Sequence, residues 1–388
     1  MGTKLFLLLA FIFTLIKAED QCQFAKNCYD CMGKDPSCSW CFKDDYDDDR
    51  MGIGHRCAPK KVLLERGCTD DKIESASSKI NKNSIQSSDP TMLQLSPSEM
   101  MSEIRPGEAL SHEFVYNSIR DYPVDLYFLV DLSYTMKDYL ETVSKLTNEI
   151  VNEMKTVTND LQIGFGVFVD KPIFPFVKPS NSELDNPCEN LDNVKCDPTF
   201  LYKHILSLSK DYAQFENVTK NIRPSGNLDR PEGGLDALLQ VVYCKQHVQW
   251  RENSRKIVLF ATDGSFHLAG DGKLAGLIKP PPKECMLDSK LDVESKMSYW
   301  GWYVAGDTDY PSIGEVAHVL TDYGVSVIFA TTNEFSQLYT KLADFLPSAG
   351  VGILVEKSAN IVKLLKENYE KIVNKADMGI EHDEEFIE

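Results

Sequence analysis

Three oxygen-bearing side chains stand at alternate positions of one short stretch: Asp131, Ser133 and Thr135. A carboxylate and two hydroxyls can converge on one hard cation, and Mg²⁺ prefers oxygen ligands in an octahedral arrangement. These three side chains supply too little charge to saturate the ion, so the pattern predicts a site that accepts one more carboxylate from a partner. The same residues are also typical of an Asp that caps a helix beside a Ser/Thr turn.

Two further acidic loops favour the ion site over the helix cap. The stretch 227–234 (NLDRPEGG) is rich in turn residues and carries three oxygen-bearing side chains, and Asp263 closely follows an apolar run at 256–260. The carboxyl ends of parallel strands meet at one edge of an open α/β sheet, which is where ligands bind. We therefore expect the three loops to meet at that edge.

Apolar runs that alternate with amphipathic stretches predict the fold that positions these loops. Strands are expected at 124–130, 162–169, 256–261, 325–331 and 350–355, and helices near 139–155, 234–250, 312–323, 335–346 and 359–374. This alternation predicts an α/β fold with a doubly wound, mostly parallel sheet. The connection 172–198 within it has a length that is usually functional.

The ends and the charge of the chain narrow the class of protein. Residues 1–18 have the short apolar core of a secretory signal peptide, so we expect a lumenal or extracellular protein. No later run is apolar and long enough for a membrane span, which predicts no anchor in this chain. The net charge of -18 argues against a nucleic-acid partner, because phosphates require a basic surface.

Eleven cysteines in an oxidising compartment are expected to pair for the most part. Four of them form two local candidate pairs, Cys188 with Cys196 and Cys244 with Cys285. The remaining seven crowd into the first 70 residues, where disulfides replace a large core. One of these seven is left over and needs a partner elsewhere.

The region between the cysteine-rich module and the α/β domain is expected to be partly extended. Residues 69–88 have the composition of a linker, and short strands are expected at 92–96 and 112–116. The segment 89–121 is too short for a sheet of its own, so it should be half of a domain into which the α/β domain is inserted. Asn217 lies in the one glycosylation sequon of the chain.

Four long motifs together resemble the integrin beta subunit: DLYFLVDLSYTMKD at 125–138, GFGVFVDKP at 164–172, NLDRPEGG at 227–234 and FHLAGDGKLAG at 266–276. The resemblance implies a disulfide-rich plexin-semaphorin-integrin (PSI) module at 19–70. A linker and the first segment of a β-sandwich hybrid domain would follow at 71–121. A von Willebrand A-like domain, the βI domain, would occupy 122–376, and a second hybrid segment would begin at 377–388.

The same resemblance implies a cysteine pairing for the module. It pairs Cys28 with Cys38, Cys31 with Cys57 and Cys41 with Cys68, and it pairs Cys22 with a cysteine in a later domain. It also implies a membrane span after the end of this chain, and hence a cell-surface receptor.

Three ion sites follow from the resemblance, residue by residue. A magnesium adhesion site would use Asp131, Ser133, Thr135, Glu232 and Asp263. A synergistic calcium site would use Asp170, Asn227, Asp229, Glu232 and the carbonyl of Pro231. An adjacent calcium site would use Asp138 with backbone groups of Thr135 and of a residue near Glu356, and we expect it to be weak or empty because Tyr139 replaces a second Asp.

The implied function is adhesion. An acidic residue of an extracellular-matrix or cell-surface ligand would complete the magnesium coordination, and an integrin alpha subunit would be the partner chain. Tyr134 and the loop closed by Cys188 and Cys196 would select ligands. Two alternatives are an anchorless secreted decoy with the same site and a phosphatase of the haloacid dehalogenase type. The phosphatase is disfavoured because Ser133 stands where such an enzyme needs an acidic general acid.

Overall fold

The structure is a computed structural model that describes most of the chain in two separate units, one up to Asn117 and one from Ser118. The described residues are 22, 25–44, 46, 53–83, 95–97, 99–105, 107–116, 121–178, 185–188, 195–291, 298–302, 308–346, 348–355 and 357–373. The expected signal peptide and the segment 377–388 lie outside them. Among these residues, no helix has the length and apolar character needed to cross a bilayer.

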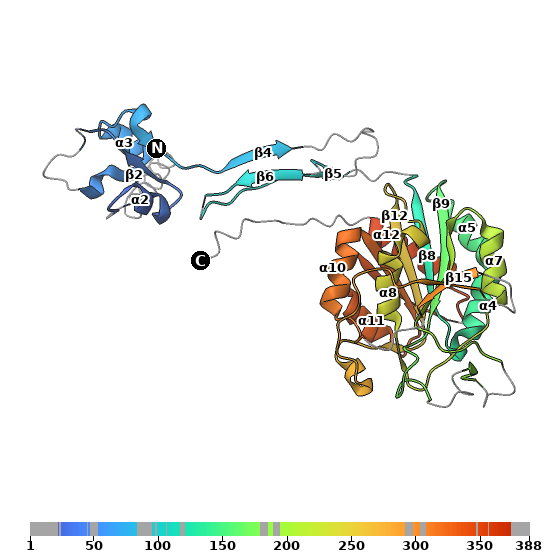
Figure 1. Cartoon of the computed structure of the whole chain (residues 1–388). Helices are drawn as coiled ribbons and strands as arrows, with labels where there is room; N and C mark the ends of the chain where they lie inside the picture. Colours follow the sequence, from blue (N-terminus) through green and yellow to red (C-terminus); the bar gives the residue numbers. More distant parts are fainter. Residues whose placement is uncertain are drawn as a thin grey trace. The chain divides into compact units, whose positions relative to one another are not determined.

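An eight-stranded sheet forms the centre of the larger unit (Figure 1). Its strands, in spatial order, are β14 (Asp288–Leu291), β15 (Ser298–Trp302), β10 (Tyr202–Ser209), β9 (Leu161–Phe168), β8 (Val124–Asp131), β12 (Arg255–Thr262), β16 (Val325–Thr331) and β17 (Ala349–Ile353). The five strands from β9 to β17 pair in parallel, and β10, β15 and β14 add antiparallel pairs. The expected doubly wound, mostly parallel sheet is confirmed.

Helices cover both faces of this sheet because each strand of its centre carries apolar side chains on both sides. Strand β8 is buried at every position. One face is covered by α4 (Lys137–Lys145), α5 (Thr147–Met154), α7 (Tyr212–Asn221) and α12 (Ile361–Val373). The other is covered by α8 (Gly234–Tyr243), α9 (Lys245–Val248), α10 (Ile313–Tyr323) and α11 (Ser336–Ala343) (Figure 1).

Two helices that were expected to be continuous are each divided. The helix expected at 139–155 breaks at Leu146, where the hydroxyl of Thr147 donates to the carbonyl of Val143 at 3.3 Å. Such a bond from a Thr side chain competes with the backbone ladder. The helix expected at 234–250 breaks at Cys244, which the disulfide to Cys285 holds in place.

The smaller unit begins with a module of short elements. Helices α2 (Cys28–Lys34) and α3 (Lys60–Glu65) flank an antiparallel sheet of β2 (Cys57–Pro59), β1 (Cys38–Cys41) and β3 (Ile73–Glu74). Two further antiparallel pairs follow: β4 (Lys79–Asn83) with β6 (Glu99–Glu103), and β5 (Leu95–Ser96) with β7 (Val115–Tyr116). Strand β4 lies in the stretch expected to be linker, because its polar composition gave no sign of a partner strand about 20 residues away.

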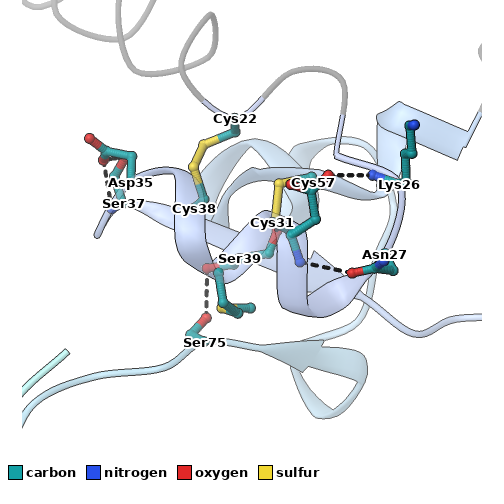
Figure 2. The surroundings of a disulfide bond; sticks show 12 residues. Cys22, Lys26, Asn27, Cys31, Asp35, Ser37, Cys38, Ser39, Cys57 and Ser75 are labelled. Atoms are coloured by element: carbon teal, nitrogen blue, oxygen red, sulfur yellow. Dashed lines mark hydrogen bonds between the residues drawn. A yellow bond between two sulfur atoms is a disulfide. The ribbon is translucent and has the colours of Figure 1, made fainter. Parts of the chain in front are cut away.

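Five disulfides join ten of the eleven cysteines, and one implied pair is wrong. The pairs implied or expected from the sequence that form are Cys31–Cys57, Cys41–Cys68, Cys188–Cys196 and Cys244–Cys285. Cys38, however, bonds to Cys22 and not to Cys28 (Figure 2). Cys22 is fully buried in the module's core, with its Cα 5.5 Å from that of Cys38. Because Cys38 is bonded to Cys22, it is not available to Cys28. Cys28 is the free thiol, half-exposed in the first turn of α2.

Arg105, which follows β6, is buried against the module and anchors this segment to it. Its guanidinium donates to backbone carbonyls of the module, at 3.1 Å to Met32, 2.9 Å to Asp35 and 3.0 Å to Cys38. It also donates to the carbonyl of Ala76, at 2.9 Å. The five N–H groups of an arginine can satisfy several carbonyls at once, so one side chain ties these segments of chain together.

Candidate metal centre

Strands β8 and β12 bring the acidic loops together. They pair in parallel with Val130 opposite Ala261, so Asp131 and Asp263 leave the sheet at the same edge. The loop with Asn227 is attached there by a β-bridge between Ser133 and Ser225. It ends in β11 (Pro231–Glu232), which pairs with β13 (Ser265–Phe266) just after Asp263. The expected meeting of the three loops is what the structure shows.

Hydrogen bonds connect the side chains expected to hold magnesium. Asp131 accepts from the backbone N–H of Ser133 at 2.7 Å and from the hydroxyl of Thr262 at 2.7 Å. The hydroxyls of Ser133 and Thr135 lie 3.2 Å apart. Thr135 in turn donates to the carboxylate of Asp263 at 3.1 Å. One carboxylate from the end of β8, one from the end of β12 and two hydroxyls thus form one hydrogen-bonded cluster.

The carboxylates of this cluster lie close together, and too little positive charge lies near them to offset their mutual repulsion. Burial, followed by repulsion from Asp263, raises the pKa of Asp131 to about 7. Burial raises the pKa of Glu232 well above its usual range, and the surrounding carboxylates, Asp131 first, raise it further. Burial also raises the pKa of Asp263. A divalent cation would neutralise this excess, and the oxygen donors fit Mg²⁺.

A second group of oxygens lies beside the first. The amide of Asn227 donates to the carbonyl of Pro231 at 3.4 Å and to the carboxylate of Glu232 at 3.1 Å. Asp170 is fully buried and accepts from the hydroxyl of Tyr310 at 2.7 Å. One carboxylate oxygen of Asp229 is buried without a hydrogen-bond partner among the described residues, and one of Asp170 has only the Nε2 of His267 near it, at 3.4 Å. Buried, unsatisfied carboxylate oxygens fit a calcium ion.

His267 belongs to this second group, although the sequence assigned it no role. Its Nε2 lies 3.0 Å from Asp229 and 3.4 Å from Asp170, and its Nδ1 lies 3.1 Å from Asp271. Burial lowers the pKa of His267, but hydrogen bonds to Asp170 and Asp229 outweigh it and raise the pKa to about 10. The residue stands in the motif 266–276, but its place among these carboxylates depends on long-range packing that no local pattern reveals.

Two glycines let the acidic loops approach this closely. A Cβ on Gly264 would lie 2.9 Å from the carbonyl oxygen of Arg230 and 3.2 Å from the side chain of Glu232. A Cβ on Gly233 would lie 2.3 Å from Leu201. Distances below about 3 Å require something to move, so these loops could not pack as they do with larger residues.

The residues expected at the adjacent calcium site are arranged differently. Asp138 forms an ion pair with Lys357. Tyr139 is half-buried and packs against the apolar core, so it adds no oxygen to this group. Glu356 lies outside the described residues. One carboxylate that already faces an ammonium does not fit a third calcium ion, which prefers several charged oxygens.

The remaining sequence-predicted residues lie at the surface or near the same edge. The disulfide between Cys188 and Cys196 is buried, and the backbone N–H of Cys196 donates to Asn186 at 2.9 Å. Tyr134 is half-buried in the turn between Ser133 and α4. Asn217 is exposed on α7, although the hydroxyl of Thr219 in its sequon is buried.

Two family models match separate parts of the chain. A model described as the integrin beta chain VWA domain matches residues 119–376, and one described as the integrin plexin domain matches residues 20–69. The second match covers the module that carries three of the disulfides. The first covers the eight-stranded sheet and all the acidic loops.

Relatives match over most of this chain but under half of their own length. Integrin beta-2 of Ovis canadensis is 38% identical over 345 residues, which are 89% of this chain and 43% of that protein. Integrin beta-6 of Homo sapiens is 35% identical over 370 residues, 94% of this chain and 46% of that protein. Integrin beta-1-A of Xenopus laevis is 35% identical over 358 residues, 90% and 43% respectively.

Proposed function

The chain belongs to the integrin beta family, and we propose that it forms the ligand-binding part of an adhesion receptor and has no enzymatic activity. The observation that carries this proposal is the cluster of buried carboxylates at the sheet edge, with Asp131 at its centre. Its hydroxyl and carboxylate oxygens can bind a cation. The position of a general acid is taken by Ser133, whose hydroxyl cannot serve that role at neutral pH.

Asp131, Ser133, Thr135, Glu232 and Asp263 would hold a magnesium ion in this receptor. Bound there, the ion would supply a positive charge and an open coordination position for an acidic residue of an extracellular ligand. The protein's own residues orient the ligands to the ion: Thr262 fixes Asp131, and Thr135 fixes Asp263. Thr135 is exposed, so the cluster is reachable from solvent.

The neighbouring group would hold calcium through Asp170, Asn227, Asp229, Glu232 and the carbonyl of Pro231. Glu232 contributes to both groups, since repulsion from Asp131 and from Asp170 and Asp229 acts on it together. Calcium binding there would fix Glu232 and thereby pre-organise the magnesium group.

An integrin alpha subunit is the proposed partner chain, and extracellular-matrix or cell-surface proteins with an exposed Asp or Glu are the proposed ligands. The disulfide-closed loop between Cys188 and Cys196, together with Tyr134, is the proposed determinant of ligand choice. We place the protein in the secretory pathway and at the cell exterior.

The test uses the chain secreted together with an alpha-subunit ectodomain and captured on a surface. Binding of purified matrix proteins is measured in Mg²⁺ and in a chelator, for the wild type and for Asp131→Ala. We expect Mg²⁺-dependent binding to fall at least ~100-fold in the variant, because the central carboxylate of the cluster is lost.

Asp344→Ala is the matched control. Asp344 is exposed at the carboxyl end of α11, and that helix runs back from the site toward the opposite edge of the sheet. This variant should bind like the wild type. Equal binding by Asp131→Ala, or binding that survives the chelator, would contradict the proposed mechanism.

A further inference from the structure

Lys357 and Asp138 join two segments that are distant in sequence. Asp138 lies in the first turn of α4, three residues after Thr135, and Lys357 lies in the loop between β17 and α12. The ammonium of Lys357 pairs with one carboxylate oxygen of Asp138. The hydrogen bond from Lys357 lowers the pKa of Asp138, and the same bond raises the pKa of Lys357.

The loop that carries Lys357 is held in an uncommon conformation. Lys357 and Ser358 both have left-handed backbones, with φ of 57° and 73°. Such angles are costly for residues other than Gly, so the surrounding structure must hold them. Asn360 does so: its side chain accepts from the N–H of Val355 at 3.0 Å and donates to the carbonyl of Ile353 at 2.8 Å. Ser358 is buried beneath the loop.

This ion pair lies at the adjacent calcium site that the resemblance to integrin beta subunits implies, and that the sequence predicts to be weak or empty. Two residues act together there. Tyr139 packs against the core and supplies no carboxylate, and Lys357 brings a positive charge to the carboxylate that remains. A calcium ion on Asp138 would have to displace the ammonium and accept a positive neighbour.

We propose that the ammonium of Lys357 serves as a tethered cation that replaces a third metal ion, linking α4 to the loop before α12 without calcium. The inference rests on the proposed function, because it concerns the regulation of the same site. Its consequence is that contact between this loop and the start of α4 does not depend on calcium concentration. It depends instead on ionic strength, because both side chains are largely exposed.

Calcium stoichiometry tests the proposal directly. The secreted chain is titrated with Ca²⁺ by calorimetry in saturating Mg²⁺, and the double variant Tyr139→Asp with Lys357→Asn is compared with the wild type. We expect the double variant to bind one more Ca²⁺ per chain, because it gains a carboxylate and loses the ammonium. Asn suits position 357 because it tolerates a left-handed backbone.

Two further variants keep the test decisive. Asp138→Asn in the otherwise wild-type chain should leave calcium stoichiometry unchanged, since the proposal gives that residue no ion. Lys363→Asn removes another exposed, ion-paired lysine and should add no calcium. Loss of one Ca²⁺ in Asp138→Asn, or no gain in a folded double variant, would overturn the proposal.

The result of this test can be distinguished from the result of the test of the proposed function. The adhesion site is tested by Mg²⁺ binding to the wild type and to Asp131→Ala in the same calorimeter. Failure of Mg²⁺ to bind the wild type would reject the adhesion site, whereas the calcium difference between wild type and double variant still reports on Lys357.

Discussion

At the scale of single residues, Thr262 determines how the central carboxylate of the candidate metal centre is oriented. Its hydroxyl donates to Asp131 at 2.7 Å from inside the sheet. Removal of such a supporting bond typically weakens metal binding by about 10- to 100-fold. We expect Thr262→Val to lower Mg²⁺ affinity by about this factor, as measured by calorimetry, without unfolding the chain.

Thr331 provides the matched control for this substitution. It stands opposite Thr262 on β16, is equally buried, and its hydroxyl has no hydrogen-bond partner among the described residues. Thr331→Val should therefore leave Mg²⁺ affinity unchanged and be neutral or stabilising. A similar loss of affinity in both variants would mean that shape at this edge of the sheet matters and the hydroxyl does not.

His204 predicts a pH dependence of stability that is independent of metal. It is buried against Tyr127, whose hydroxyl lies 2.8 Å from its Nδ1. Burial lowers its pKa from 6.5 to about 4, and the charge of His247 lowers it further. The unfolded chain therefore binds the proton more readily between these two pKa values, and stability falls as the pH falls through this window.

Urea unfolding of the wild type and of His204→Gln checks this prediction. From about pH 8 to about pH 5, the wild type should lose about 2 kcal/mol more than the variant, since a pKa difference of one unit corresponds to about 1.4 kcal/mol. Parallel losses in the two proteins would contradict the assignment to His204 and would show that other groups account for the acid sensitivity, since carboxyls whose pKa is raised by burial gain stability as the pH falls.

At the scale of elements, Gly352 sets how closely α12 packs on the edge strand β17. A Cβ at this position would lie 2.2 Å from the side chain of Leu364 on α12. Overpacking of this kind commonly costs about 1–3 kcal/mol. We expect Gly352→Ala to destabilise the chain by this amount in urea unfolding.

Gly314 in α10 is the control for this substitution, because the nearest atom to its added Cβ is 4.0 Å away. Gly314→Ala should be neutral or stabilising, as Ala favours a helix more than Gly does. Equal destabilisation by both changes would point to backbone effects and not to the contact with α12.

Sequence patterns predicted the five parallel strands of the sheet and missed the three antiparallel ones. These five strands read as apolar runs, and each lies within about two residues of its expected ends. Strand β10 alternates in burial and includes Lys203 and His204, so its sequence YKHILSLS carried a weaker signal. Its neighbour β15 pairs with it from about 100 residues away, a contact that no local pattern reports.

The residues of the candidate metal centre likewise divide into those that the sequence predicted and those that it did not. Asp131, Ser133 and Thr135 are close in sequence, so their convergence could be predicted from spacing. Thr262 lies one residue beyond the strand predicted at 256–261, and no pattern in the sequence gave it a role. Lys357 acquires its partner only through the packing of the loop before α12 against α4, so the sequence could suggest a weak calcium site without showing what replaces the ion.

At the scale of the whole molecule, the pairing in the module makes Cys28 the one free thiol of the eleven cysteines. Burial raises its pKa, which slows but does not prevent alkylation of a half-exposed group. Alkylation of the folded, unreduced chain should therefore place one label per molecule, on Cys28, as peptide mapping by mass spectrometry can show.

The same map distinguishes the two pairings considered above. A label on Cys22 in place of Cys28 would support the pair Cys28–Cys38 that the resemblance implied, and would contradict the structure. The Cys28→Ser variant should carry no label and retain all five disulfides.

Arg105 has a consequence for where the N-terminal module can be cut. The family model of the module ends at residue 69, yet the carbonyls of Met32, Asp35 and Cys38 are satisfied by a guanidinium well beyond that boundary in the chain. The segment that the family model matches and the segment whose contacts hold the module together therefore end at different residues. A fragment that ends at residue 69 would lack Arg105 and the hydrogen bonds that it donates to these carbonyls. A recombinant module should therefore extend at least to Arg105.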